Sequence, residues 1–118
     1  MGITEERKDI KAKMTEVTNS MSNVASAVAA YNQDLNSWPH YDGVITIRTS
    51  LGLMIPTNRI SSITVTSPRA EEVIITATIK GIHSRVDGKT LTLTGKPSGR
   101  GILWMWGGTV PSTYVPGR

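Results

Sequence analysis

The longest uninterrupted pattern in the chain is a helical one near the N-terminus. No Gly or Pro occurs from Thr4 to Leu35, and apolar residues recur there at alternating intervals of four and three, along one side of a helix. These residues are Ile10, Met14, Val17, Met21, Val24, Val28, Tyr31 and Leu35. Thr4 can cap the start, and the Trp38–Pro39 pair ends the pattern because proline disfavours helical backbone in the preceding residue. We therefore expect one helix over residues 4–36.

Such a helix is too long for the domain that carries it. About 32 residues span roughly 48 Å, whereas a globule of this chain length is about 30 Å across. We expect the C-terminal half to pack on the chain's own sheet, with Met21, Val24, Val28, Tyr31 and Leu35 in the core. For the N-terminal half we expect contact with other subunits. Its contact residues would be Ile10, Met14 and Val17, largely exposed in the monomer.

After Pro39 the pattern changes from helical to extended. Short runs rich in Val, Ile and Thr cover residues 43–49, 60–66, 73–80, 89–94 and 101–106, separated by Gly, Pro, Asn and Asp. Strict alternation from Thr90 to Thr94 predicts that Leu91 and Leu93 face a core. Asp87–Gly88 is a strong hairpin signal, and the short connections favour antiparallel neighbours. The expected sheet has four strands, or five if residues 43–49 join it.

These elements predict an α+β fold in a single domain, because 118 residues are too few for two independent cores. We expect a helix over residues 4–36, a connecting loop with a short strand over 37–59, an antiparallel sheet over 60–106 and a C-terminal tail over 107–118. The chain has no Cys, which excludes disulfides and thiolate metal sites. No apolar window approaches the length of a membrane span.

Residues that could carry chemistry are sparse. His40 and His83 are the only histidines, and neither has a second candidate ligand at metal spacing. Phosphate-binding, nucleophile and metalloprotease motifs are absent from the sequence. We therefore expect no enzyme activity, no cofactor, no metal and no small-molecule substrate. The net charge of +4 comes from basic residues scattered over strands and turns, without the interleaved aromatic residues that single-strand binding uses.

Two sets of residues resemble a known family. Ser26 to Tyr31 followed by Asn36 to Pro39 resembles the end of the long first helix of type IV pilins and pseudopilins, where a Tyr is followed by an aromatic residue and Pro. The later segments resemble the type IVa pilin group in their order. They are Leu51–Leu53, Ile60–Val65, Ile75–Ile79, Gly88–Thr94, Trp104 and Tyr114–Pro116.

The resemblance implies a structural subunit that polymerises through its N-terminal helix into an extracellular filament for adhesion, twitching motility or DNA uptake. Its partners would be other copies of the pilin. The resemblance also implies a hydrophobic half-helix, missing here, which would place the full-length protein in the inner membrane before assembly. One alternative is a type II secretion pseudopilin, although residues 107–118 contain no acid that could bind calcium. Another is a minor pilin whose basic head binds duplex DNA weakly. Outside the family, a coiled-coil oligomerisation module remains open.

The sequence departs from the family at the tail. Pilins of this group usually close the last strand to the tail by a disulfide, with cysteines near the positions of Trp106 and Gly117, and this chain has neither. The tail must then be held by packing of Trp104, Trp106, Tyr114 and Val115. We expect Tyr114 and Val115 to cover the face of Trp104 and Trp106, or Met105 on the opposite face.

Overall fold

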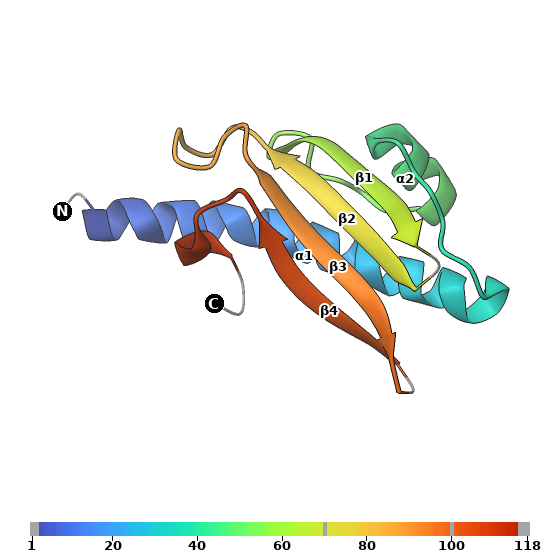
Figure 1. The fold of residues 1–118 in the computed structure, drawn as a ribbon. Coiled ribbons are helices and arrows are strands. Elements are labelled where there is room, and N and C mark those ends of the chain that lie inside the picture. Colours follow the sequence, from blue (N-terminus) through green and yellow to red (C-terminus); the bar gives the residue numbers. More distant parts are fainter. Residues whose placement is uncertain (1–2, 70, 100, 116–118) are drawn as a thin grey trace.

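The computed structural model describes residues 3–69, 71–99 and 101–115, with the side chains of residues 3–6 excepted. One long helix, α1 (Ile3–Leu35), crosses a single face of an antiparallel sheet (Figure 1). The strands are β1 (Ile60–Arg69), β2 (Glu72–Ile79), β3 (Thr90–Ser98) and β4 (Gly101–Gly108). A short helix, α2 (Val44–Leu51), lies beside β1, and a 3-10 turn, η1 (Ser112–Tyr114), ends the described chain. The α+β fold expected from the sequence is confirmed.

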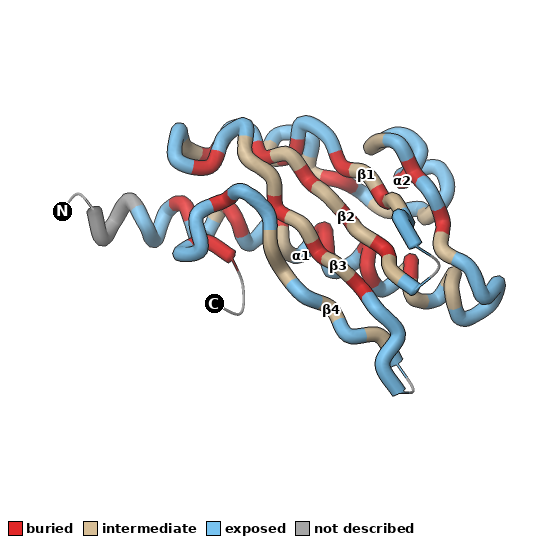
Figure 2. Tube along the Cα trace, viewed as in Figure 1, coloured by how far each residue is buried: buried red, intermediate tan, exposed pale blue. Residues whose placement is uncertain are grey.

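The sheet has the order β1-β2-β3-β4, and each strand pairs with its neighbour in sequence. Side chains alternate between its two faces because the strand period is two. The face toward α1 is apolar, as in the row Val65, Ile75 and Leu93, whereas the outer face carries rows such as Thr64, Thr76 and Thr92. The resulting alternation of buried and half-buried residues is visible along β2 and β3 (Figure 2).

The C-terminal half of α1 packs on this apolar face. Met21, Val24 and Val28 are fully buried, and Tyr31 is half-buried. The placement of Leu35 in the core is wrong, because its side chain is 60% exposed. The last turn of α1 extends beyond the ends of the strands, so no sheet lies over it (Figure 1).

The N-terminal half of α1 differs more strongly from expectation. Ile10, Met14 and Val17 are at most 2% exposed, so the prediction that they are free for other subunits is wrong. They belong to the same core cluster as Ile82 and Val86 of the β2–β3 loop and as Val110, Tyr114 and Val115 of the tail. Segments outside the sheet therefore extend the core along the helix.

The prediction of a short strand over residues 43–49 is also wrong, because residues 44–51 form the helix α2. The spacing of Val44, Ile47 and Leu51 is helical, and Ile47 is fully buried. Gly52 ends the helix in the left-handed conformation, with φ of 68°, which glycine adopts without strain. A single antiparallel bridge joins Tyr41 to Val65 in this region.

Asp87–Gly88 closes the β2–β3 hairpin without forming a two-residue turn on its own. The connection covers residues 80–89, and Asp87 Oδ1 accepts hydrogen bonds from the backbone N–H groups of Ile82 (2.9 Å) and His83 (3.1 Å). Gly88 has φ of 79° and donates to the carbonyl of Ile79 at 2.8 Å. The loop therefore has internal order, which allows Ile82 and Val86 to be held in the core.

We predict that Val28→Asp destabilises the protein by at least 3 kcal/mol or prevents folding, because a carboxylate would be buried without a partner, at a cost of roughly that size. Ala30→Asp is the control, since Ala30 lies on the same helix but is exposed. Chemical denaturation measures both variants. Equal unfolding free energies for the two variants would contradict the assigned buried face.

Candidate subunit interface

The side of α1 that faces away from the sheet is small and polar. Its exposed residues include Ala12, Thr15, Asn19 and Ala30. The molecule measures 50 × 30 × 19 Å, and the 33-residue helix runs along the long dimension, with its N-terminal turns projecting past the sheet (Figure 1). This exposed side is therefore a continuous surface on which another element can pack closely.

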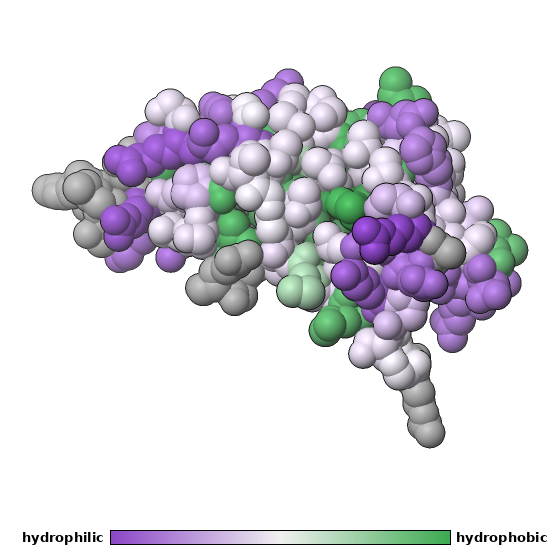
Figure 3. All heavy atoms as spheres, viewed as in Figure 1, coloured by the Kyte–Doolittle hydropathy of each residue, from purple (hydrophilic) through white to green (hydrophobic). Residues whose placement is uncertain are grey.

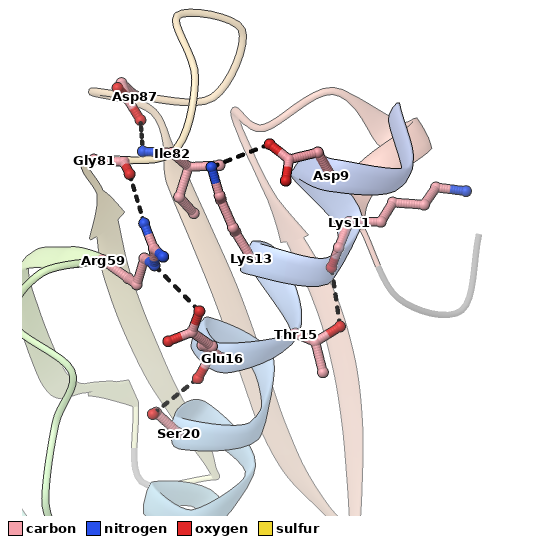
Figure 4. Close-up of polar contacts among 10 residues, drawn as sticks. All are labelled: Asp9, Lys11, Lys13, Thr15, Glu16, Ser20, Arg59, Gly81, Ile82 and Asp87. Atoms are coloured by element: carbon pink, nitrogen blue, oxygen red, sulfur yellow. Dashed lines mark hydrogen bonds and ion pairs between the residues drawn. The ribbon is translucent and has the colours of Figure 1, made fainter. Parts of the chain in front are cut away.

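Arg59 connects the N-terminal half of α1 to the rest of the domain (Figure 4). Its Nε donates to Glu16 Oε2 at 3.2 Å, and its Nη1 donates to the carbonyl of Gly81 at 2.7 Å. The backbone of Arg59 continues this link, because its carbonyl accepts from Lys80 N–H at 2.9 Å. One guanidinium thus ties the helix, the start of β1 and the β2–β3 loop together, which keeps the loop over the helix.

The C-terminal tail docks on α1. Tyr114 and Val115 are buried and, with Thr113, share a hollow of about 250 Å³ with Met14, Thr15 and other α1 residues. Met105, on the opposite face of the sheet, remains exposed. The alternative that Tyr114 and Val115 cover Met105 is therefore wrong, whereas their contact with the face of Trp104 and Trp106 stays a prediction. After Gly108, whose φ of 114° suits glycine, the chain leaves β4 and turns toward the helix.

Backbone hydrogen bonds fix the start of this tail. The N–H groups of Thr109 and Val110 donate to the carbonyl of Thr90 at 2.9 and 3.1 Å. Thr90 N–H in turn donates to Thr109 Oγ1 at 2.8 Å. The tail is therefore held by the first residue of β3 and by apolar packing on α1, in the place where the resemblance would put a disulfide.

Trp104 and Trp106 point toward α1 and are half-buried. They pair with Gly95 and Leu93 of β3. A Cβ at Gly95 would lie 2.6 Å from Trp104 Cζ3, closer than atoms approach in proteins, so the indole ring lies directly over this glycine. The sequence placed the two tryptophans correctly on one face but did not show that the helix lies opposite them.

The described residues offer little for catalysis. They contain no cluster of His, Asp and Glu that could hold a metal ion. His40 Nε2 and Asp42 Oδ1 are 2.8 Å apart, but both side chains are well exposed. Burial, and to a lesser degree Tyr31, raises the pKa of the Tyr41 hydroxyl above its ordinary value. No described helix combines the length and apolar character needed to cross a membrane.

A comparison with known protein families finds one match. The model of the family described as pilin (bacterial filament) matches residues 10–118, which is all of the chain except its first nine residues. No curated protein matches the chain. The match includes α1 from Ile10 onward, the whole sheet and the tail.

We predict that Arg59→Ala lowers the free energy of unfolding by about 1 to 2 kcal/mol, the sum expected for a partly exposed ion pair and one hydrogen bond to a carbonyl. It should also speed amide exchange in the loop at Ile82. Lys80→Ala, an exposed position in the same loop, is the control. Loop exchange that is unchanged in Arg59→Ala would show that Arg59 does not hold the loop.

Tyr114→Ala should cost about 3 kcal/mol, because removing a buried aromatic ring leaves a cavity. Thr113→Ala, an exposed neighbour, should have little effect. Urea denaturation compares them. A loss below about 0.5 kcal/mol, the usual size for an unremarkable surface substitution, would mean that the tail does not dock on α1 in solution.

Proposed function

The chain belongs to the pilin family, and on that premise we propose that it is a type IV pilin that polymerises with copies of itself into an extracellular filament. Proteins of this family are filament subunits with a structural role and not enzymes. The observation that carries the proposal is the family match over residues 10–118, since it includes both the long helix and the sheet. Contact with other pilin subunits follows from membership in such a family.

The structure changes which residues of α1 we assign to polymerisation. Because Ile10, Met14 and Val17 are used inside the domain, they are not available to a neighbour. We assign the contact to the exposed side of α1, where Ala12, Thr15 and Asn19 allow a neighbouring element to approach closely. Burial of this side between subunits would complete the packing of the helix.

Among the alternatives, we favour a filament for adhesion or motility over a DNA-binding pilin. Several of the basic side chains are already paired with carboxylates. Arg59 contacts Glu16 at 3.2 Å, Lys96 contacts Glu72 at 3.6 Å and Lys13 contacts Asp9 at 3.0 Å. The other basic residues in the described part of the chain are spread over α1, α2, β1 and the loops, which does not favour a concentrated site for phosphates. The acid-free tail likewise gives no support to a calcium-binding pseudopilin.

We predict that Thr15→Arg leaves the domain folded and reduces filament yield at least tenfold, because a long cation on the exposed side of α1 would block close packing. Ser84→Arg is the control, because Ser84 is likewise exposed but lies on the β2–β3 loop and not on α1. Filaments sheared from cells are quantified by electron microscopy, and the melting temperature of each purified variant reports folding.

Normal filament yield in Thr15→Arg, with Arg retained at that position, would show that this side of α1 is not the polymerisation surface. Equal losses in both variants would indicate a general effect of added charge on assembly, which would equally contradict the assignment.

A further inference from the structure

The chain contains two Asp–Gly pairs, and the structure holds them in opposite ways. They are Asp42–Gly43, just before α2, and Asp87–Gly88, at the end of the β2–β3 loop. An aspartate followed by glycine can close into a cyclic imide, because the glycine nitrogen can attack the side-chain carbon Cγ of the aspartate. Glycine favours this step since it has no Cβ to hinder the approach. In a folded chain, ring closure depends on how freely the two groups can meet.

The two reacting groups of Asp42–Gly43 are free to meet. The Asp42 side chain is 85% exposed, and its contact is with exposed His40, whose Nε2 lies 2.8 Å from Asp42 Oδ1. Within the described part of the chain, the N–H of Gly43 makes no hydrogen bond. Both residues line an open hollow of about 340 Å³ between the start of α2 and β1. The surface over α2 shows hydrophilic residues beside hydrophobic ones (Figure 3). Water and room for the side chain to turn are therefore both present.

The same two groups are both engaged at Asp87–Gly88. Asp87 Oδ1 accepts hydrogen bonds from the backbone N–H groups of Ile82 (2.9 Å) and His83 (3.1 Å). The first of these bonds is drawn in Figure 4. The N–H of Gly88 donates to the carbonyl of Ile79 at 2.8 Å. Ring closure here requires the carboxylate and the nitrogen to give up these bonds first. The second pair is therefore an internal reference with the same chemistry and a different degree of restraint.

We propose that Asp42–Gly43 is a site of spontaneous backbone isomerisation, with His40 as the proton donor. The Gly43 nitrogen forms a bond to Asp42 Cγ, and one carboxylate oxygen leaves as water. That water carries the amide proton of Gly43 and one proton from the His40 imidazolium, whose 2.8 Å distance to Oδ1 is within reach for general acid catalysis.

A second water molecule then opens the ring. It attacks the backbone carbonyl carbon of Asp42, and the bond from that carbon to the Gly43 nitrogen breaks. The nitrogen takes one proton of the water, and the new carboxylic acid releases the other to solvent. The chain now continues through the former side chain of Asp42, as an isoaspartate. The reaction consumes no other reactant.

The isomerisation acts on the start of α2. Residue 42 lies between two fixed points. Tyr41 exchanges two backbone hydrogen bonds of 2.9 Å with Val65, and the carbonyl of Gly43 accepts a bond of 3.1 Å from Ile47 N–H. An isoaspartate lengthens the backbone between these points by one carbon and leaves the net charge unchanged. The bond from Ile47 is the longer of the two kinds, so α2 loosens. This inference is independent of the proposed function, because the chemistry takes place in the single chain.

Incubation of the purified chain at neutral pH, in water enriched in a heavy oxygen isotope, tests the site. Each ring opening places one solvent oxygen in the residue, so peptide mass spectrometry measures the rate at both Asp–Gly pairs of one sample. Label should enter at Asp42 at least tenfold faster than at Asp87. A protease that cleaves before aspartate but not before isoaspartate should progressively lose its cut before residue 42.

Two variants separate the contributions of the groups. Gly43→Ala should slow labelling at Asp42 at least tenfold, because a methyl group then hinders the nitrogen. It should fold, since Gly43 is extended, with φ of −180°, and an added Cβ meets no atom within 4 Å. His40→Gln keeps a hydrogen-bond donor but has no acidic proton, and labelling should slow at least threefold.

Each failure points to a different part of the proposal. Equal labelling of Asp42 and Asp87 in the parent chain would overturn the site, as would labelling of Gly43→Ala at the parent rate. An unchanged rate in His40→Gln would overturn His40 as the proton donor. If either variant failed to fold, the two pairs of the parent chain would still decide the site. Amide exchange at Ile47 should be faster in aged than in fresh protein, and equal exchange would overturn the loosening of α2.

Discussion

The packing of one apolar side of α1 against the rest of the chain is the constraint on which this structure depends. The helix runs the 50 Å length of the molecule, yet the strands lie over only part of it. The domain covers the remainder with segments that are not strands, namely the β2–β3 loop and the tail. Each segment is held by hydrogen bonds as well as by apolar contact. The bonds of the loop involve Arg59 and Asp87, and those of the tail involve the carbonyl of Thr90. The loop and the tail are therefore part of the core.

This arrangement explains how the domain manages without a disulfide. A crosslink stabilises chiefly by restricting the unfolded chain, whereas docking on α1 stabilises the folded state directly. The buried ring of Tyr114 and the side chain of Val115 supply that docking. The same contact buries Met14, so the docked tail also covers this part of the helix. The apolar side of α1 is therefore used within the domain and is not free for a neighbouring copy.

The sequence was most informative where periodicity is strict. Alternation from Thr90 to Thr94 correctly separated the inward Leu91 and Leu93 from the outward threonines, and the four-three spacing located the helix to within a residue or two. It failed at α2, because Val44 to Thr49 is rich in β-branched residues whose strand propensity is overridden by packing of Ile47. The sequence also failed to predict the burial of Ile10, Met14 and Val17. Irregular segments such as 80–89 and 109–115 have no hydrophobic periodicity, so the sequence does not show which residues they will cover.

The outward threonine rows have a consequence for how such a protein can change over generations. Thr64, Thr76 and Thr92 lie on the face of the sheet away from the helix, where strand propensity is the main requirement on their identity. Substitutions there alter the hydroxyl-rich outer face while the core and the edges stay as they are. The chemistry of this face can therefore change without loss of the fold. The two faces of one thin sheet thus place different requirements on their side chains.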